Sequence, residues 1–248
     1  MRFTVPKPVH GWRTFWGEVG IIVLGVLIAL GAQQVAEKLS VRQRADDSTA
    51  TLRAEIIDHG QYAYEIEVVA PCIRAQAEAL EERLKTVNSD PAPRFSEDGF
   101  KAYYVVRIPD RPWSSSAWDA VRNEDALRQV DPAFARQMYK YYAQLTWMLA
   151  DNRSAVDLAA TLNSLSIVVP RDEGDRMRYI DAAEKLIDTT AKMALVAGQL
   201  RDRMAKTGLL PLDRDLKQAL AGSGTIKFCR AHRLPLATPR RADPKEAD

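Results

Sequence analysis

The sequence predicts an all-α protein in which an N-terminal transmembrane helix continues into a bundle of long helices. Three observations predict this fold: an uncharged apolar segment near the N-terminus, apolar residues at helical spacing beyond it, and a composition typical of a folded domain. We expect a cytoplasmic N-terminal segment (1–18), a transmembrane helix (19–36), a helical bundle domain (37–234) and a disordered tail (235–248).

The composition limits the function classes. A chain of 248 residues with 46% hydrophobic and 27% charged residues suits one folded domain with appendages, and it excludes wholesale disorder and a polytopic membrane protein. The 35 basic and 33 acidic residues leave a net charge of only +2. We therefore expect no nucleic-acid partner.

The segment 19–36 carries no charge and covers about 27 Å as a helix, close to the hydrocarbon thickness of a bilayer. Trp12 and Trp16 lie one turn apart before it, where indole rings favour the interface, and Arg13 and Lys38 flank it. The lipid bilayer is therefore the expected partner of 19–36. Two alternatives stay open: a cleaved signal peptide, with Ala29 and Gly31 before the cut, and a core helix of a soluble domain.

The orientation is not fixed by charge, because three basic residues precede the apolar segment and three follow it: Arg2, Lys7, Arg13, and Lys38, Arg42, Arg44. Long C-terminal domains cross the membrane whatever their charge. We expect the N-terminus inside and the C-terminal domain outside the cytoplasm.

Beyond the membrane, apolar positions alternate at spacings of four and three, which predicts that the membrane helix continues outward as a stalk or first bundle helix with a narrow apolar seam. Pro71 is a possible bend. The seam consists of Leu52, Ile56, His59, Ala63, Ile66, Ala70, Ile73, Ala77, Leu80, Leu84 and Val87. The carboxylates between them are interpreted as solvated: Glu65, Glu67, Glu78, Glu81 and Glu82.

The next segments are shorter. Paired prolines within 88–95 predict a break that reverses the chain, and 100–108 can be a strand or a helical turn. The serines at 114–116 predict the start of a short helix that carries Trp118 and Val121 and, if it is long enough, Leu127.

Two long helices and one short helix complete the prediction. Asp131 followed by proline predicts the start of a helix that runs past Leu162 and ends before Pro170. Acidic residues at 172–175 predict another start, and Gly208 its end. A last short helix is expected around 213–221. From Pro235 onward the chain has almost no apolar content, which predicts disorder.

No pattern of catalytic residues is evident, so we expect no enzyme, no cofactor and no metal. The chain has only three histidines, and His59 lies on the apolar seam, where a structural role is expected. The patterns of nucleotide, zinc-protease and serine-hydrolase sites are absent. His232, Cys229 and Cys72 offer three metal ligands but no fourth.

The two cysteines form one possible disulfide, between Cys72 and Cys229, if the domain lies in an oxidising compartment. Such a bond would tie the C-terminal segment to the first long helix.

An aromatic zone is the other candidate site. Its members are Trp113, Trp118, Tyr139, Tyr141, Tyr142 and Trp147. These rings either fill the core or line a pocket or interaction groove. For the pocket, we single out Trp113, Trp118 and Tyr142, with Asp119 as a convergent acid.

The segment Phe15-Trp-Gly-Glu-Val-Gly-Ile-Ile-Val-Leu-Gly-Val-Leu-Ile-Ala-Leu30, followed by Leu52-Arg-Ala-Glu-Ile56, resembles an uncharacterised family of bacterial single-pass membrane proteins. Their anchor of the type Gly-Glu-Ile-x-Leu-x-x-x-Gly-Ile-Leu-Ile-Ala-Leu precedes a helical domain of unknown function. The usual asparagine-rich exit from the anchor is replaced here by Gln33-Gln34. The resemblance implies a bacterial inner-membrane protein with one span, and it implies no activity.

These observations favour a membrane-anchored protein-interaction or scaffolding module of the bacterial cell envelope, which binds another envelope protein or forms a homo-oligomer. Two alternatives are a periplasmic small-molecule sensor and an enzyme with a pocket near Trp113 and Trp118.

Overall fold

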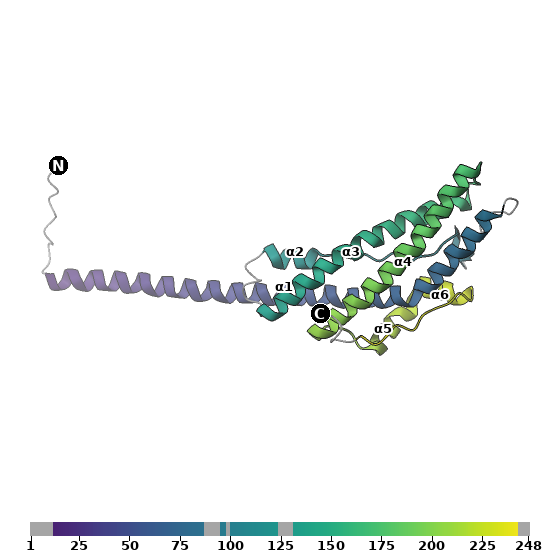
Figure 1. Cartoon of the computed structure of the whole chain (residues 1–248). Coiled ribbons are helices and arrows are strands. Elements are labelled where there is room, and N and C mark those ends of the chain that lie inside the picture. Colours follow the sequence, from purple (N-terminus) through teal and green to yellow (C-terminus); the bar gives the residue numbers. More distant parts are fainter. Residues whose placement is uncertain (1–11, 87–94, 98–99, 124–130, 243–248) are drawn as a thin grey trace, which may run out of the picture.

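The computed structural model describes residues 12–86, 95–97, 100–123 and 131–242. The chain forms α1 (Trp12–Lys85), β1 (Phe95–Glu97), β2 (Phe100–Tyr104), α2 (Ser116–Asn123), α3 (Pro132–Asn163), α4 (Glu173–Thr207), α5 (Asp213–Ala219) and α6 (Gly224–Ala231), as Figure 1 shows. Short 3₁₀ turns follow α3 and α5. The all-α prediction is confirmed, with a two-stranded antiparallel hairpin as its minor β component.

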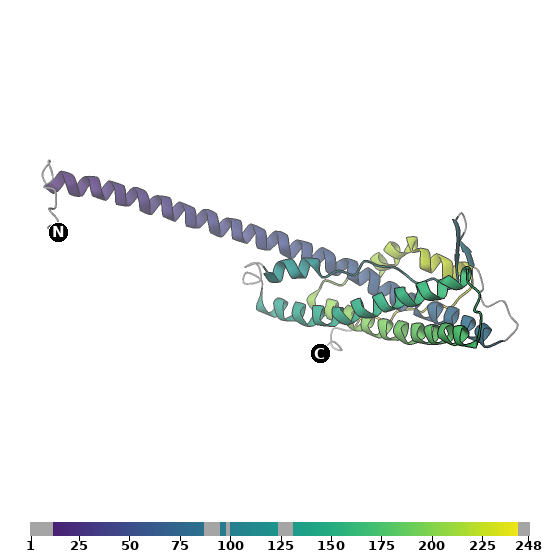
Figure 2. The ribbon, with the colours of Figure 1, turned by 90° about the horizontal axis from the view of Figure 1, so that it is seen from above.

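A single helix, α1, joins the apolar segment to the bundle. It has 74 residues and spans about 110 Å, and Pro71 lies inside it. Its N-terminal part projects alone from the bundle in Figures 1 and 2. This part contains a segment long and apolar enough to cross a membrane, none of which is buried. The prediction that the apolar N-terminal helix continues into the bundle is confirmed.

The distal half of α1 is the central helix of the bundle. The described positions of the predicted seam are buried, apart from Ala70, which is half-buried. Val87 lies outside the described residues. Burial extends well beyond the seam, because Tyr64, Val69 and Cys72 on other faces of α1 are also covered. One face of α1 packs closely against α4 and meets α3 through side chains such as His59 and Tyr141, and another face packs against the C-terminal elements.

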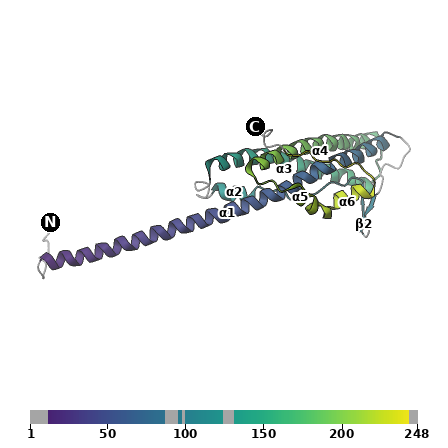
Figure 3. The ribbon, with the colours of Figure 1, turned by 90° about the horizontal axis from the view of Figure 1, so that it is seen from below.

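The starts and ends of α3 and α4 follow the sequence signals. The Asp131 side chain accepts the backbone N–H of Phe134 at 2.9 Å, and Asp172 accepts that of Asp175 at 2.8 Å. Gly208 ends α4 with a φ of 67°, a left-handed conformation that favours glycine. The two helices pack antiparallel, side by side, in Figures 2 and 3. They form the outer layer against α1.

The shorter elements cover the other faces of α1. The segment 100–108, whose type the sequence left open, begins as strand β2. Helix α2 begins after the predicted serines, and α5 matches the predicted last helix. The predicted break at 88–95 lies mostly outside the described residues, as does Leu127. Helix α6 was not predicted. Ser223 caps it by accepting the N–H of Ile226 at 3.1 Å.

The prediction of a disordered tail is wrong for residues 235–242, which we call the C-terminal strap. The N–H of Ala237 donates to the carbonyl of Val68 on α1 at 2.9 Å, and Leu236 packs on the core. Arg240 forms an ion pair with the buried Asp202 of α4. The polar composition of the strap suggested disorder, but its few apolar and charged groups find buried partners. Residues 243–248 lie outside the described part of the chain.

Candidate functional site

The predicted aromatic zone divides into a buried part and an exposed part. Trp118 stacks on Tyr142 with 5.2 Å between ring centroids and 6° between planes, and both side chains are buried. The Tyr142 hydroxyl donates to Glu55 of α1 at 2.7 Å. The same carboxylate accepts the N–H of Ala117 at 3.1 Å, at the start of α2. Burial, and then the bond to Glu55, raises the pKa of Tyr142. This cluster fixes α2 and α3 on α1.

His59 lies at the centre of the buried aromatic part. Its Nδ1 is 3.0 Å from the Tyr141 hydroxyl, and its Nε2 accepts the N–H of Ser114 at 3.4 Å. The hydrogen bond from Ser114 assigns the proton of the neutral ring to Nδ1, which then donates to Tyr141. Burial lowers the pKa of His59 to about 4 against the opposing charge of Glu55. His59 is therefore a neutral core residue at physiological pH.

The four residues proposed to share a pocket do not converge on one. Trp113, Trp118 and Tyr142 are core side chains, whereas the Asp119 side chain is 47% exposed. Asp119 accepts a hydrogen bond from the Ser115 hydroxyl at 3.0 Å and forms an ion pair with Arg122 at 3.2 Å. Both partners lie in α2 or directly before it, so these interactions stabilise α2. Asp119 therefore lies on the solvent side of α2, apart from the buried rings. The Trp113 indole N–H is buried without an acceptor among the described residues.

The two cysteines lie together in the structure. Cys72 of α1 and Cys229 of α6 form a disulfide with 6.1 Å between their Cα atoms. Both are fully buried, and Phe228 and Leu236 pack around them. The bond therefore holds α6 and the root of the C-terminal strap on the central helix.

Two buried carboxylates of α1 are paired rather than solvated, which corrects the sequence interpretation. Glu65 is fully buried and accepts both Nε and Nη2 of Arg111, at 2.5 and 3.0 Å, and the hydroxyl of Ser223. Arg111 comes from the loop before α2, and Ser223 precedes α6. The pair therefore joins three parts of the chain.

Glu67 forms the second such network. It pairs with Arg201 of α4, which is 1% exposed and also donates to the carbonyl of Arg240 at 3.2 Å. Burial raises the pKa of Glu67, and the charge of Arg201 opposes this shift. Gly198 admits the network, because a Cβ at this position would lie 3.1 Å from Glu67 Oε1. These carboxylates are paired with arginines inside the fold, so they are not free to bind a cationic ligand.

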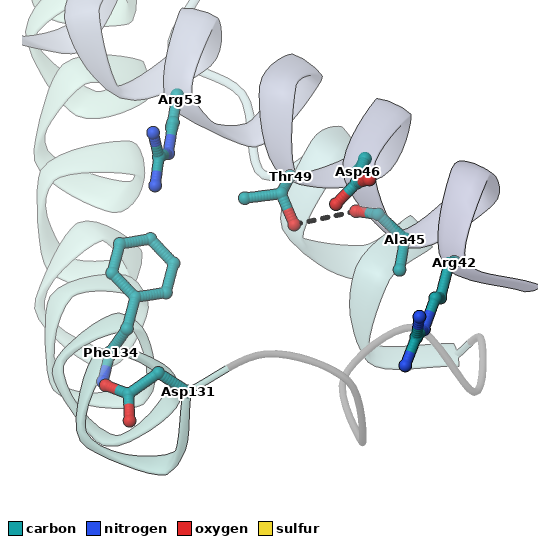
Figure 4. Close-up of a pocket in the computed structure, with 7 residues that line it drawn as sticks. All are labelled: Arg42, Ala45, Asp46, Thr49, Arg53, Asp131 and Phe134. Atoms are coloured by element: carbon teal, nitrogen blue, oxygen red, sulfur yellow. Dashed lines mark hydrogen bonds between the residues drawn. The ribbon is translucent and has the colours of Figure 1, made fainter.

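One surface cleft lies at the membrane-proximal end of the bundle, between α1 and the start of α3 (Figure 4). Its volume is about 630 Å³, and it is lined by Arg42, Ala45, Asp46, Thr49, Arg53, Asp131 and Phe134. The Arg53 guanidinium lies 6.0 Å from the Phe134 ring centre. Two arginines face two aspartates, so the cleft has balanced charge. Its α1 residues start about 9 Å beyond position 36 along the helix and reach about 26 Å.

A second surface groove lies between α3 and α4, on the side away from α1. We call it the outer groove. Its volume is about 580 Å³, and it is lined by Lys140, Ala143, Gln144, Trp147, Val196, Gln199 and Arg203. Trp147 is 70% exposed there, a large value for a tryptophan. The seven lining residues include two cations and no acid.

Side-chain hydrogen bonds hold the floor of the outer groove. The Gln144 amide donates to Gln199 across the groove, and Arg203 donates from Nε to the Gln144 oxygen at 2.6 Å. A fixed floor with an exposed indole ring favours recognition of a partner over catalysis. Within the described ranges, no group of three or more His, Cys, Asp and Glu side chains is placed to hold a metal ion.

The sequence contained a signal for the outer groove that the aromatic interpretation did not use. Tyr141, Leu145 and Met148 follow the buried face of α3. Trp147 lies outside this periodicity, on the face of the helix that points away from the core. A helical wheel would have separated Trp147 from the core rings. Val196 and Arg203 of α4 carry no comparable signal, because only the fold brings them beside α3.

No protein-family model, no curated protein and no solved structure matches this chain.

Proposed function

We propose that this chain is a single-pass protein of the bacterial inner membrane that presents a helical protein-interaction domain in the periplasm. The apolar part of α1 supports the anchor, and the anchor's resemblance to bacterial single-pass proteins supports the membrane. The Cys72–Cys229 disulfide supports the compartment, because such bonds persist in the oxidising periplasm and are rare in the cytosol.

The observation that carries the interaction role is the exposure of Trp147 in the outer groove. Helices α3 and α4 form a groove on each of their two sides. The core side chains cover the inner sides of both helices, and the outer groove is open. Contact between the apolar indole ring and water is unfavourable, and a partner that covers the ring removes this contact. Tryptophan is also enriched at the centres of protein interfaces.

The enzyme and sensor alternatives receive less support. The enzyme required space around Trp113 and Trp118, but Trp113 packs against His59 and Trp118 stacks on Tyr142. The acid proposed for the pocket, Asp119, pairs with Arg122 on the surface of α2. A ligand would have to displace core side chains.

Photo-cross-linking in whole cells tests the interaction role. A photoreactive amino acid at Ala143 or Gln199 in the full-length chain places the probe beside Trp147 without replacing it. We expect one discrete cross-linked partner from both positions, which the added substitution Trp147→Ala removes. The matched control is a probe at the exposed Lys227 of α6, outside the groove.

Two results would overturn the proposal. One is that positions 143 and 199 give no adduct beyond that of position 227. The other is that the adducts survive Trp147→Ala. Because Trp147 is exposed, its truncation leaves the core intact, so loss of the adduct reports the surface.

A further inference from the structure

We infer that the outer groove binds an acidic amphipathic helix of a partner protein, with a large apolar residue of that helix against Trp147. This inference rests on the proposed function and names the chemistry of the partner. Shape, charge and the order of residues along the groove each support it.

The shape is that of a seat for one more helix. Two antiparallel helices side by side leave a groove between them, and α1 packs on the inner side, mainly against α4. Ala143 and Val196 add apolar surface to the lining of the outer groove, and Trp147 is 70% exposed there. An amphipathic helix that lays its apolar face into such a groove is a recurring mode of recognition.

The charge selects an acidic partner. Lys140 and Arg203 stand on opposite helices at one end of the groove, and none of the seven lining residues is acidic. Lys140 is exposed and makes no ion pair among the described residues. A second copy of this chain would bring the same cations into the groove if the two grooves met face to face. Repulsion therefore disfavours that pairing.

The order of residues sets the spacing on the partner. Lys140 and Trp147 are seven residues apart on α3, which is two helical turns or about 10 Å. Because α4 runs antiparallel to α3, Arg203 rather than Val196 lies toward the Lys140 end. The partner helix therefore carries its acidic residues about two turns from its main apolar residue. The cationic end of the groove is the membrane-proximal one, because α3 and α1 run in the same direction (Figure 1).

A pair of designed peptides tests the inference with the full-length protein in lipid nanodiscs. The first is a labelled 18-residue helix, about five turns long, with leucines on one face and glutamates on its flanks, and the second replaces every glutamate with lysine. Fluorescence anisotropy measures their Kd. We expect the acidic peptide to bind at least about 10-fold more tightly, and Trp147→Ala to weaken it by at least about 10-fold.

Charge reversal supplies the matched variants. Lys140→Glu should weaken the acidic peptide and strengthen the lysine peptide, whereas Lys185→Glu on α4, outside the groove, should change neither. Equal binding of the two peptides, or acidic-peptide binding that Trp147→Ala leaves unchanged, would overturn the inference. A Trp147-dependent dimer in sedimentation would assign the groove to a second copy and overturn it as well.

The two proposals fail separately. If neither peptide binds but cross-links at positions 143 and 199 persist and depend on Trp147, the partner chemistry is wrong and the interaction role stands. If the cross-links are absent as well, both proposals are wrong.

Discussion

At the scale of single residues, burial of His59 among aromatic rings couples stability to pH. Its folded pKa of about 4 lies below the usual value of 6.5, because burial disfavours the charged ring. Folding therefore favours the neutral form. The contribution is fully present above pH 6.5, and it is lost as the pH falls from 6.5 to 4, where the unfolded chain binds the proton first.

We predict that the protein loses about 2 kcal/mol of its free energy of unfolding between pH 7.5 and pH 5 through His59 alone. Urea unfolding of the detergent-solubilised chain at the two pH values measures this loss. His59→Gln should remove that part of the pH dependence, even if it lowers stability at both pH values. His232→Gln, at the end of α6, is the control. An unchanged pH dependence in His59→Gln would refute the assignment.

The buried pair of Glu65 and Arg111 makes a second prediction at this scale. Arg111→Met should destabilise the fold by about 3–5 kcal/mol, because it leaves a fully buried carboxylate without its cation. Arg122→Met breaks the Asp119 pair, whose side chains are both about half exposed, and should cost less than about 1 kcal/mol. The difference in denaturation midpoint measures both. Similar losses in the two variants would contradict the role of burial.

These residues also show where sequence reasoning ended. Glu65 and Glu67 alternate with apolar positions, as solvated carboxylates on an amphipathic helix do, so the pattern predicted exposure. Their partners, Arg111 and Arg201, lie 46 and 134 residues further along the chain. Nothing local in the sequence indicates a pairing that distant. The same holds for the outer groove, which exists only where α3 meets α4.

At the scale of elements, local chemistry was the better guide. The starts of α3 and α4 depend on aspartate caps and the end of α4 on a glycine, and all three act within four residues of the chain. Helix α6 was missed because eight residues give too short a periodicity, and its burial depends on the disulfide. The strap was missed because its order depends on contacts with α1 and α4 rather than on its own composition.

The disulfide should contribute about 2–5 kcal/mol to the free energy of unfolding, because it links two residues that are 157 positions apart in the sequence. We predict that the double substitution Cys72→Ala, Cys229→Ala lowers the urea midpoint and exposes the strap to protease. Trypsin cleavage after Arg240 and Arg241 in the strap, followed by mass spectrometry, reports the second effect. Oxidised wild-type protein is the control. Equal cleavage of the two proteins would mean that the strap is held without the bond.

At the scale of the whole molecule, continuity of α1 fixes where the bundle sits. The helix runs from position 36 to its end at Lys85 over about 74 Å without an interruption. One continuous helix therefore contains both the apolar segment and the central helix of the bundle. In the proposed topology this continuity leaves no hinge between the membrane and the bundle, so the outer groove would face partners near the same bilayer.

This arrangement gives the prediction that decides the compartment. A reporter fused to the C-terminus that is active only in the periplasm should be active in whole cells, and a cytoplasm-specific reporter should be silent. In the same cells, Cys72 and Cys229 should resist maleimide labelling after denaturation until a reductant is added. Residues 37–248 expressed without the apolar segment provide the contrast, because in the reducing cytosol both thiols should label at once. Cytoplasmic reporter activity with freely labelled thiols in the full chain would reverse the orientation, and the partner of the outer groove would then have to be a cytosolic protein.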